Sequence, residues 1–341
     1  MAKSTATTTK NATTAVVAPA VAALESAARS GVFDQPVEFD VTAARNTYMA
    51  ELVGAGLLIP SGVPGINGRS ATFEWIVEGI VSAITRRSAF DRAEIVRFPP
   101  VVTRENYVRS GHVKSFPHLA GSVHAFVGDD RAHRALLAKV DAGERWTDDL
   151  EPTDVVLTPA ACYPLYPYSA GTVPSDGRLF DVQSYCFRHE PSNDPMRMQM
   201  FRQQEHVRIG TPAQVAMWRD TWFARSQELL TDLRLQFVAE VANDPFFGRS
   251  GRLMAASQRE QALKFELNVA IIHPDHPTAC VSLNAHEDHF GHEFGIFLAD
   301  GSHASTSCIG FGLERTALAL LRRHGLDPQQ WPSDVRSVLE P

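Results

Sequence analysis

Two short stretches of this chain alternate between apolar and polar residues, and this alternation constrains the fold more than any other feature of the sequence. In KFELNVAII (264–272), the apolar set is Phe265, Leu267, Val269 and Ile271, and the polar set is Lys264, Glu266 and Asn268. A period of two residues indicates a β-strand with two unlike faces. ACVSLNA (279–285) is a second such stretch, which presents Cys280, Ser282 and Asn284 on one side. We predict two strands whose polar faces form the floor of a polar site.

Helical patterns surround these strands. Apolar residues recur at helical spacing in the stretches 42–58, 72–87, 212–237 and 312–325. Thr211 and Pro212 open the third as N-cap and first helical residue, and Gly325 closes the fourth. A further strand is expected over 94–102. Because strands and helices follow one another without a regular βαβ rhythm, we predict an α+β fold, an antiparallel β-sheet flanked by helices.

Composition narrows the class of protein. Lys and Arg number 32 against 39 Asp and Glu, a formal charge of -7, so no global basic field draws in a polyanion such as tRNA. The four cysteines form no CxxC pair and no signal peptide is recognised, which favours a cytoplasmic protein with thiols free for metal. No run approaches the about 20 apolar residues of a membrane-spanning helix. Residues 1–34 are Ala- and Thr-rich and predict a disordered tail before a domain over 35–341.

Candidate chemistry gathers in two segments. The segment YCFRHEPSNDPMRMQMFRQQEH (185–206) predicts two strands joined by a turn-rich loop, with Arg188 and Arg197 at its mouth. Guanidinium groups pair bidentately with phosphate, so this hairpin would suit a triphosphate; a surface hairpin laced with ion pairs is the equal alternative. In SCIGFGLERTALALL (307–321), glycines precede Arg315 in the first turn of a helix. Walker A, GxGxxG and GxSxG motifs are absent from the sequence.

Together these segments resemble the second and third signature motifs of class II aminoacyl-tRNA synthetases. The resemblance implies that Arg188 contacts the α-phosphate of ATP, that Glu190 reads adenine, and that Phe201 stacks on the base. It places Arg315 against the γ-phosphate, and the two arginines are the candidate catalytic residues. Helix 72–87 and the strand after it resemble the first motif, which implies a homodimer.

Within class II, the sequence is most similar to the amino acid:[carrier protein] ligases, relatives of the zinc-containing seryl-tRNA synthetases of methanogens, over about residues 50 to 325. The segments that carry this resemblance are TPAACYPLYP (158–167), FRQQEH (201–206), LNAHEDHFG (283–291) and TSCIGFGLER (306–315). It implies one Zn²⁺ on Cys162, Glu205 and Cys308, with the fourth position open for the substrate amino group, so that Glu205 also belongs to the substrate site. Further ATP-binding positions implied are Arg197, Met198, Lys264, Ala279, Cys280, Val281 and Ser282, with Mg²⁺ accompanying ATP.

The resemblance therefore implies an enzyme that activates glycine or alanine with ATP and passes it to the phosphopantetheine thiol of a carrier protein. Only about 70 residues precede the first motif, so no separate tRNA-binding domain is expected. Two alternatives stay open: a truncated seryl-tRNA synthetase acting on tRNA, and a non-catalytic paralogue used as a binding module. Helix 212–237, with Arg219, Arg225 and Arg234, is a candidate for carrier docking. The histidines from His286 to His292 suggest a second metal site, but we favour a solvated loop or positions beside the first metal.

Overall fold

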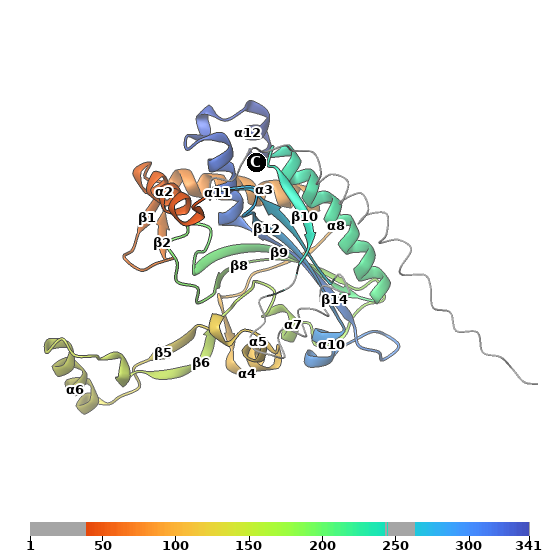
Figure 1. Ribbon diagram of the computed structural model, residues 1–341. Helices are drawn as coiled ribbons and strands as arrows, with labels where there is room; N and C mark the ends of the chain where they lie inside the picture. Colours follow the sequence, from red (N-terminus) through yellow and green to blue (C-terminus); the bar gives the residue numbers. More distant parts are fainter. Residues whose placement is uncertain (1–38, 243, 245–262, 341) are drawn as a thin grey trace, which may run out of the picture. The chain divides into compact units, whose positions relative to one another are not determined.

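The computed structural model describes residues 39–242, 244 and 263–340 (Figure 1). The chain divides into two compact units, Met1–Asp40 and Val41–Pro341. The predicted tail, 1–34, lies outside the described residues. The described helices and strands all belong to the second unit.

A seven-stranded sheet forms the centre of this unit. Its strand order is β10 (Phe237–Val241), β11 (Lys264–Val269), β12 (Thr278–Glu287), β14 (Ser305–Gly312), β9 (Met200–Gly210), β8 (Arg178–Phe187) and β3 (Glu94–Val96). All neighbours are antiparallel except β3 and β8, which are parallel. The predicted antiparallel sheet is confirmed, apart from its edge strand β3.

The two alternating stretches lie side by side as β11 and β12. Lys264 pairs with Asn284 and Glu266 with Ser282, so the two polar faces coincide as predicted. The pairing shifts between Leu267 and Asn268, which makes Cys280 the extra residue of a β-bulge. The predicted alternation of β12 therefore breaks at Cys280. The prediction missed this break because a bulge cannot be recognised from periodicity alone.

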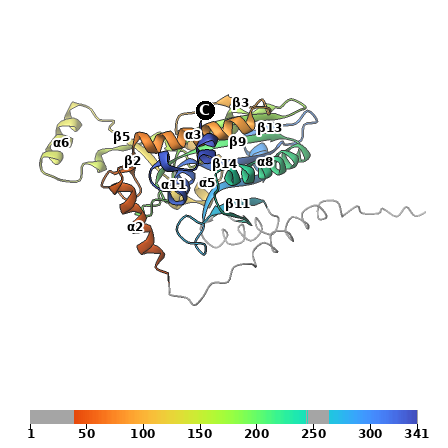
Figure 2. The same ribbon diagram turned by 90° about the horizontal axis from the view of Figure 1, so that it is seen from above.

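Three long helices cover the sheet. They are α3 (Ala71–Ser88), α8 (Pro212–Asp232) and α11 (Leu313–His324). Figure 2 shows α3 running along the sheet with α11 beside it. The predicted caps are present: Thr211 forms a capping box with Gln214, and α11 ends at Gly325. Helix α8 stops at Asp232, short of the predicted 237, because Phe237 already begins β10.

Two further helices add to the helical layer. They are α2 (Val41–Gly54), shorter than the predicted 42–58, which lies against α11, and α12 (Ser333–Leu339), which lies against α3. Tyr48 of α2 is fully buried and its hydroxyl donates to the Leu318 carbonyl at 2.6 Å. Gly79 of α3 faces Leu339 so closely that an added Cβ would lie 2.7 Å from the leucine Cβ. Only glycine therefore allows the two helices to meet here.

The remaining elements are short and surround the ends of the sheet. Two small sheets join β1 (Leu58–Pro60) with β2 (Asn67–Arg69), and β7 (Gly171–Thr172) with β13 (Ile296–Phe297). A third contains β4 (Val101–Thr103), β6 (Glu151–Leu157) and β5 (Ser122–Ala125). The short helices are α4 (Arg104–Arg109), α5 (His112–Ser115), α6 (Asp130–Asp141), α7 (Leu165–Tyr168) and α10 (His289–Phe294), with 3₁₀ turns at Pro117–Leu119, Thr147–Asp149 and Pro328–Gln330.

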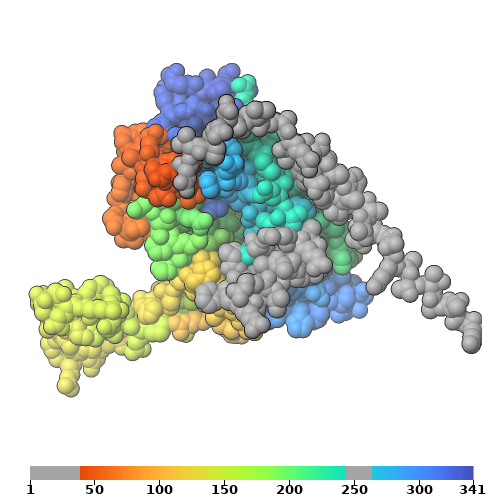
Figure 3. Space-filling view, in the orientation of Figure 1, coloured from red at the N-terminus to blue at the C-terminus, as the bar shows by residue number. Residues whose placement is uncertain are grey.

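The segment 104–157 was not assigned from the sequence. The expected strand 94–102 is split at Pro99 and Pro100, so that β3 joins the large sheet and β4 the three-stranded one. Figures 1 and 3 show β5, β6 and α6 extending from the rest of the unit as an arm. Helix α6 buries no residue. Among the described helices, none is both long enough and apolar enough to cross a membrane.

Candidate active site

The candidate residues meet in one cavity of about 840 Å³ over the polar face of the sheet. Its floor comes from β9, β11, β12 and β14, and its walls from 159–163, α4, α5 and α10. Of the residues predicted to form the site, those that line it are Cys162, Arg188, Glu190, Met198, Glu205, Lys264, Ala279, Cys280, Val281, Ser282, Cys308 and Arg315. Arg197 is the exception. Phe201, the candidate for stacking on the base, also lines the cavity.

Three potential metal ligands lie together at one end of this cavity. The ligand atoms of Cys162, Glu205 and Cys308 are all within 4.8 Å of one another, and all three residues are buried. The sheet register explains part of this cluster. Cys308 of β14 pairs with Val207 of β9, two residues from Glu205, so the thiol and the carboxyl are diagonal neighbours on one face. The loop after β6 brings Cys162 over them.

The electrostatics of this cluster suit a cation. A hydrogen bond between the two thiols raises the pKa of Cys162 and lowers the pKa of Cys308, so the pair holds one negative charge readily. Burial, followed by the charge of Cys308, raises the pKa of Glu205 to about 8. Its Oε1 accepts from the Ala161 amide at 3.1 Å, and its Oε2 is buried without a hydrogen-bond partner among the described residues. Two thiolates and a carboxylate, with one buried oxygen free, fit Zn²⁺.

Polar groups beside Cys308 orient its sulfur. Asn284 Nδ2 lies 3.6 Å and His286 Nε2 3.7 Å from Sγ, and His286 Nδ1 lies 3.0 Å from Thr306 Oγ1. His289, in contrast, contacts the Ser110 carbonyl at 3.3 Å. Of the histidine run, His286 thus lies beside the cluster, one of the two arrangements that we favoured from the sequence.

Two guanidinium groups lie farther along the cavity without a carboxylate partner. Arg188 Nε donates to the Pro159 carbonyl at 3.1 Å, and its guanidinium lies over the Phe201 ring at 5.3 Å. Arg315 donates to the carbonyls of Met196 (2.9 Å) and Ala279 (3.1 Å). Within the described residues neither arginine forms an ion pair. Burial, then the charge of Arg188, lowers the pKa of Arg315. Uncompensated positive charges in a cavity attract an anion.

Other predicted nucleotide contacts are engaged with neighbouring side chains. Arg197 lies outside the cavity wall and its Nη1 is 3.1 Å from Glu190 Oε1. Lys264 Nζ lies 3.0 Å from Glu266 and also pairs with Asp244. Both carboxylates hold the ammonium in place, and they raise the pKa of Lys264 against the opposing effect of burial.

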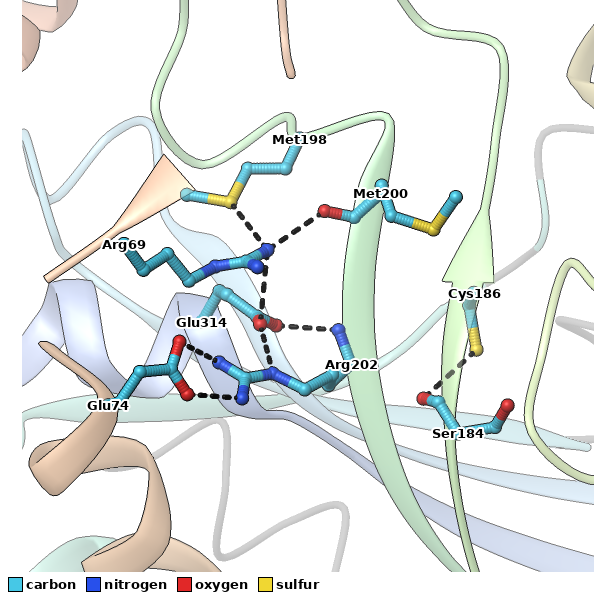
Figure 4. A network of polar contacts seen from close by, with 8 residues as sticks. All are labelled: Arg69, Glu74, Ser184, Cys186, Met198, Met200, Arg202 and Glu314. Atoms are coloured by element: carbon cyan, nitrogen blue, oxygen red, sulfur yellow. Dashed lines mark hydrogen bonds and ion pairs between the residues drawn. The ribbon is translucent and has the colours of Figure 1, made fainter. Parts of the chain in front are cut away.

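A buried ion network beneath the cavity was not foreseen (Figure 4). Glu314 accepts from the Arg202 amide and from its Nε, both at 2.7 Å, and lies 3.3 Å from Arg69 Nη2. Arg202 also pairs with Glu74 at 2.9 Å, and Arg69 donates to the Met200 carbonyl at 3.0 Å. The network ties the hairpin strand β9 to the start of α11, one residue before Arg315. Its members come from three distant parts of the chain, with Arg69 and Glu74 in the first, so no sequence spacing indicates it.

The candidate docking helix α8 offers little free positive charge. Arg219 pairs with Asp220, Arg225 with Asp91 and Arg234 with Asp334. Because each guanidinium has its own carboxylate, this helix does not form the basic stripe that an acidic carrier would favour.

The sheet topology, its helical cover and the hairpin and helix that bear the two arginines define the class II aminoacyl-tRNA synthetase catalytic fold. The M. kandleri SerRS, solved in complex with A. aeolicus tRNASec, has the same fold, with a TM-score of 0.75 at 20% identity. The match covers 91% of this chain and 62% of that one, so the chain spans less than two thirds of the synthetase.

Closer relatives specify the family, although no family model matches the chain. Amino acid–[acyl-carrier-protein] ligases 2 and 1 of Bradyrhizobium diazoefficiens are 47% and 45% identical over 280 residues, 82% of this chain and 84% and 86% of theirs. The chain belongs to the family of amino acid–[acyl-carrier-protein] ligases. The resemblance that the sequence motifs indicated is confirmed at this level.

Proposed function

We propose that this protein activates glycine or alanine with ATP as the aminoacyl-adenylate and transfers it to the phosphopantetheine thiol of a carrier protein. The observation that carries the proposal is one cavity with two unlike ends. One end holds the buried cluster of Cys162, Glu205 and Cys308, and the other holds Arg188 and Arg315, which have no carboxylate partner among the described residues. An amino acid and ATP suit this arrangement. The amine would bind at the cluster, the polyphosphate would bind at the arginines, and the carboxyl group of the amino acid would lie between them.

At the cluster end, Zn²⁺ bound by the three ligands would supply a Lewis acid that accepts a neutral α-amine but not an ammonium. The surrounding side chains support a small substrate. Tyr166 is buried and stacks on Phe290, a cavity residue, with ring centroids 3.8 Å apart. We propose that these packed rings exclude amino acid side chains larger than a methyl group. Glycine and alanine differ by one methyl, about 1 kcal/mol of apolar burial, so both are proposed.

At the arginine end, the chain would position ATP, which carries Mg²⁺. Arg188 would contact the α-phosphate, with Phe201 and Glu190 near the base, and Arg315 would contact the γ-phosphate. The amino acid carboxylate then attacks the α-phosphorus in line, and pyrophosphate leaves with its electron pair. Fixed guanidinium groups stabilise charge that grows on the phosphate oxygens without reorganisation.

The acceptor follows from the family, whose members from Bradyrhizobium diazoefficiens are named for acyl-carrier proteins. We propose a phosphopantetheine-bearing carrier rather than tRNA as the partner, and a cytoplasmic homodimer as the working form. All four cysteines are free thiols and buried, in keeping with a reducing compartment.

Amino-acid-dependent exchange of labelled pyrophosphate into ATP tests the activation step, with glycine, alanine and serine as substrates. Cys308→Ser should lose zinc and lower exchange at least a hundredfold. The matched control is Cys186→Ser, which removes another buried thiol outside the cavity. No exchange with any amino acid by a zinc-containing protein would refute the proposal. A serine preference together with charging of tRNA would favour a tRNA-acting enzyme.

A further inference from the structure

The imidazole of His112 is a polar group of the cavity wall that the proposed function leaves unused. It opens α5, its side chain is buried, and it lines the cavity. Its Nδ1 lies 2.9 Å from the Tyr163 hydroxyl, and the ring packs between Tyr107 and Phe116 at centroid distances of 5.0 Å. Its Nε2 is buried without a hydrogen-bond partner in the described part of the chain. Buried polar atoms in folded proteins are almost always paired, so a ligand is the natural partner for this one.

The surroundings fix the protonation of this histidine. Burial first, and then Arg188, lower the pKa of His112 to about 3, with a smaller opposing effect of Asp244 and a further lowering by His118. The imidazole is therefore neutral at physiological pH. The Tyr163 phenol also carries its proton at this pH, because the ordinary pKa of tyrosine is about 10.

The tautomer follows from counting donors and acceptors. If the Tyr163 hydroxyl donates to Nδ1, the imidazole proton lies on Nε2, and one buried donor lacks a partner. If Nδ1 donated instead, both the phenolic proton and the Nε2 lone pair would lack one. The first arrangement leaves fewer groups unsatisfied, so Nε2–H is a donor available to the cavity.

Two neighbours place this donor near both ends of the proposed substrate. Tyr163 follows the zinc ligand Cys162 in the chain, and Arg188, proposed at the α-phosphate, is close enough to lower the histidine pKa. In an aminoacyl-adenylate, the atoms between the amine and the α-phosphorus are the α-carbon and the acyl group. The acyl group therefore comes beside His112 when both ends are engaged.

We propose that His112 Nε2–H donates a hydrogen bond to the acyl oxygen of the substrate and stabilises the negative charge that forms there during thiol attack. This inference rests on the proposed function. The sulfur, having lost its proton to water, forms a bond to the acyl carbon, and the carbonyl electron pair moves onto the oxygen. The pair then returns, the carbon–oxygen bond to the phosphate breaks, and AMP leaves with that bond's electrons. A neutral imidazole suits this role because its fixed N–H is aimed at developing charge.

The test compares His112→Asn with His112→Gln. An asparagine amide ends near the position of Nδ1, whereas a glutamine amide nitrogen can reach that of Nε2. Transfer is measured in single turnovers from preformed enzyme-bound glycyl- or alanyl-adenylate to pantetheine, and activation by pyrophosphate exchange. We expect His112→Asn to lower transfer about a hundredfold, exchange to fall less than tenfold, and His112→Gln to recover part of the loss. His133→Asn on α6, outside the cavity wall, is the control and should match the wild type.

Transfer by His112→Asn within threefold of the wild type would overturn the inference. So would equal losses of exchange and transfer in both histidine variants, which indicate a structural role. If His112→Asn fails to fold, as judged by the loss of cooperative unfolding, Tyr163→Phe is the deciding variant. It removes the hydroxyl that keeps the imidazole proton on Nε2, so unchanged transfer would refute the inference. Failure of the wild type to exchange with any amino acid counts against the proposed function instead.

Discussion

Replacing Glu314 by glutamine should reveal how much the buried ion network contributes to stability. The Glu314 side chain is 2% exposed and faces Arg202 and Arg69, whose side chains are 12% and 9% exposed. Glu314→Gln leaves two guanidinium groups with Glu74 as their one carboxylate in this network. Removing one partner of a buried pair costs about 3–5 kcal/mol, because the remaining charge stays desolvated. We expect that loss in the free energy of unfolding.

The matched comparison is Glu74→Gln, which breaks the other ion pair of Arg202. The Glu74 side chain is 33% exposed, so water screens the charge left behind, and we expect a loss of about 1 kcal/mol. Urea unfolding of the zinc-loaded protein at pH 7 measures both values. Because Glu314 precedes Arg315, its variant should also raise the KM for ATP in pyrophosphate exchange. Equal losses for the two variants, or a Glu314→Gln loss below about 1 kcal/mol, would refute the assignment of stability to burial.

Two further predictions concern pH and assembly. The pKa of His112 is about 3 in the folded protein and about 6.5 in an unfolded chain, so the unfolded state binds the extra proton between these values and stability falls as pH drops below 6.5. Between pH 6.5 and pH 5 this one group should lower the free energy of unfolding by about 2 kcal/mol. Urea unfolding at the two pH values should therefore show a loss that is smaller by this amount in His112→Asn. A variant with the same pH dependence as the wild type would contradict the prediction. Phe90 is 93% exposed and Ile95, on the edge strand β3, is 69% exposed, where the first class II motif implies a homodimer. The double variant Phe90→Asp, Ile95→Asp should reduce the mass measured by sedimentation from twice 37.5 kDa to 37.5 kDa. The control Met217→Asp, at an exposed position of α8, should keep the dimer mass. A wild type that is already monomeric at micromolar concentration would refute the dimer.

Local patterns in the sequence predicted the centre of the fold. Strands β11 and β12 and helices α3, α8 and α11 follow from periodicity and caps, because each has one buried face and one polar one. The bulge at Cys280 and the split of 94–102 into two sheets did not follow, since both depend on pairing between strands. Segment 104–157 contains short elements with few buried side chains, and such elements leave weak periodic signals.

The candidate site also contains residues that the sequence predicted and residues that it missed. The proposed metal ligands, Arg188 and Arg315 came from the family resemblance of motifs in single segments, and the fold brings them into one cavity. His112 and the network of Glu314 were missed because their partners come from distant segments. Tyr163 is next to a predicted ligand, yet nothing in its sequence neighbourhood points to His112. Roles that depend on long-range contact need the three-dimensional arrangement.

The two thiols of the cluster make this protein sensitive to oxidation when no metal is bound. Without metal, Cys162 and Cys308 present a thiolate beside a thiol, with their sulfur atoms within 4.8 Å. Such a pair is readily oxidised to a disulfide, which occupies two of the three ligands. The proposed zinc ion and oxidants would therefore compete for the same two sulfur atoms. Zinc bound soon after synthesis would protect this pair, and chains oxidised before they bind zinc would need a reductant to restore the ligands.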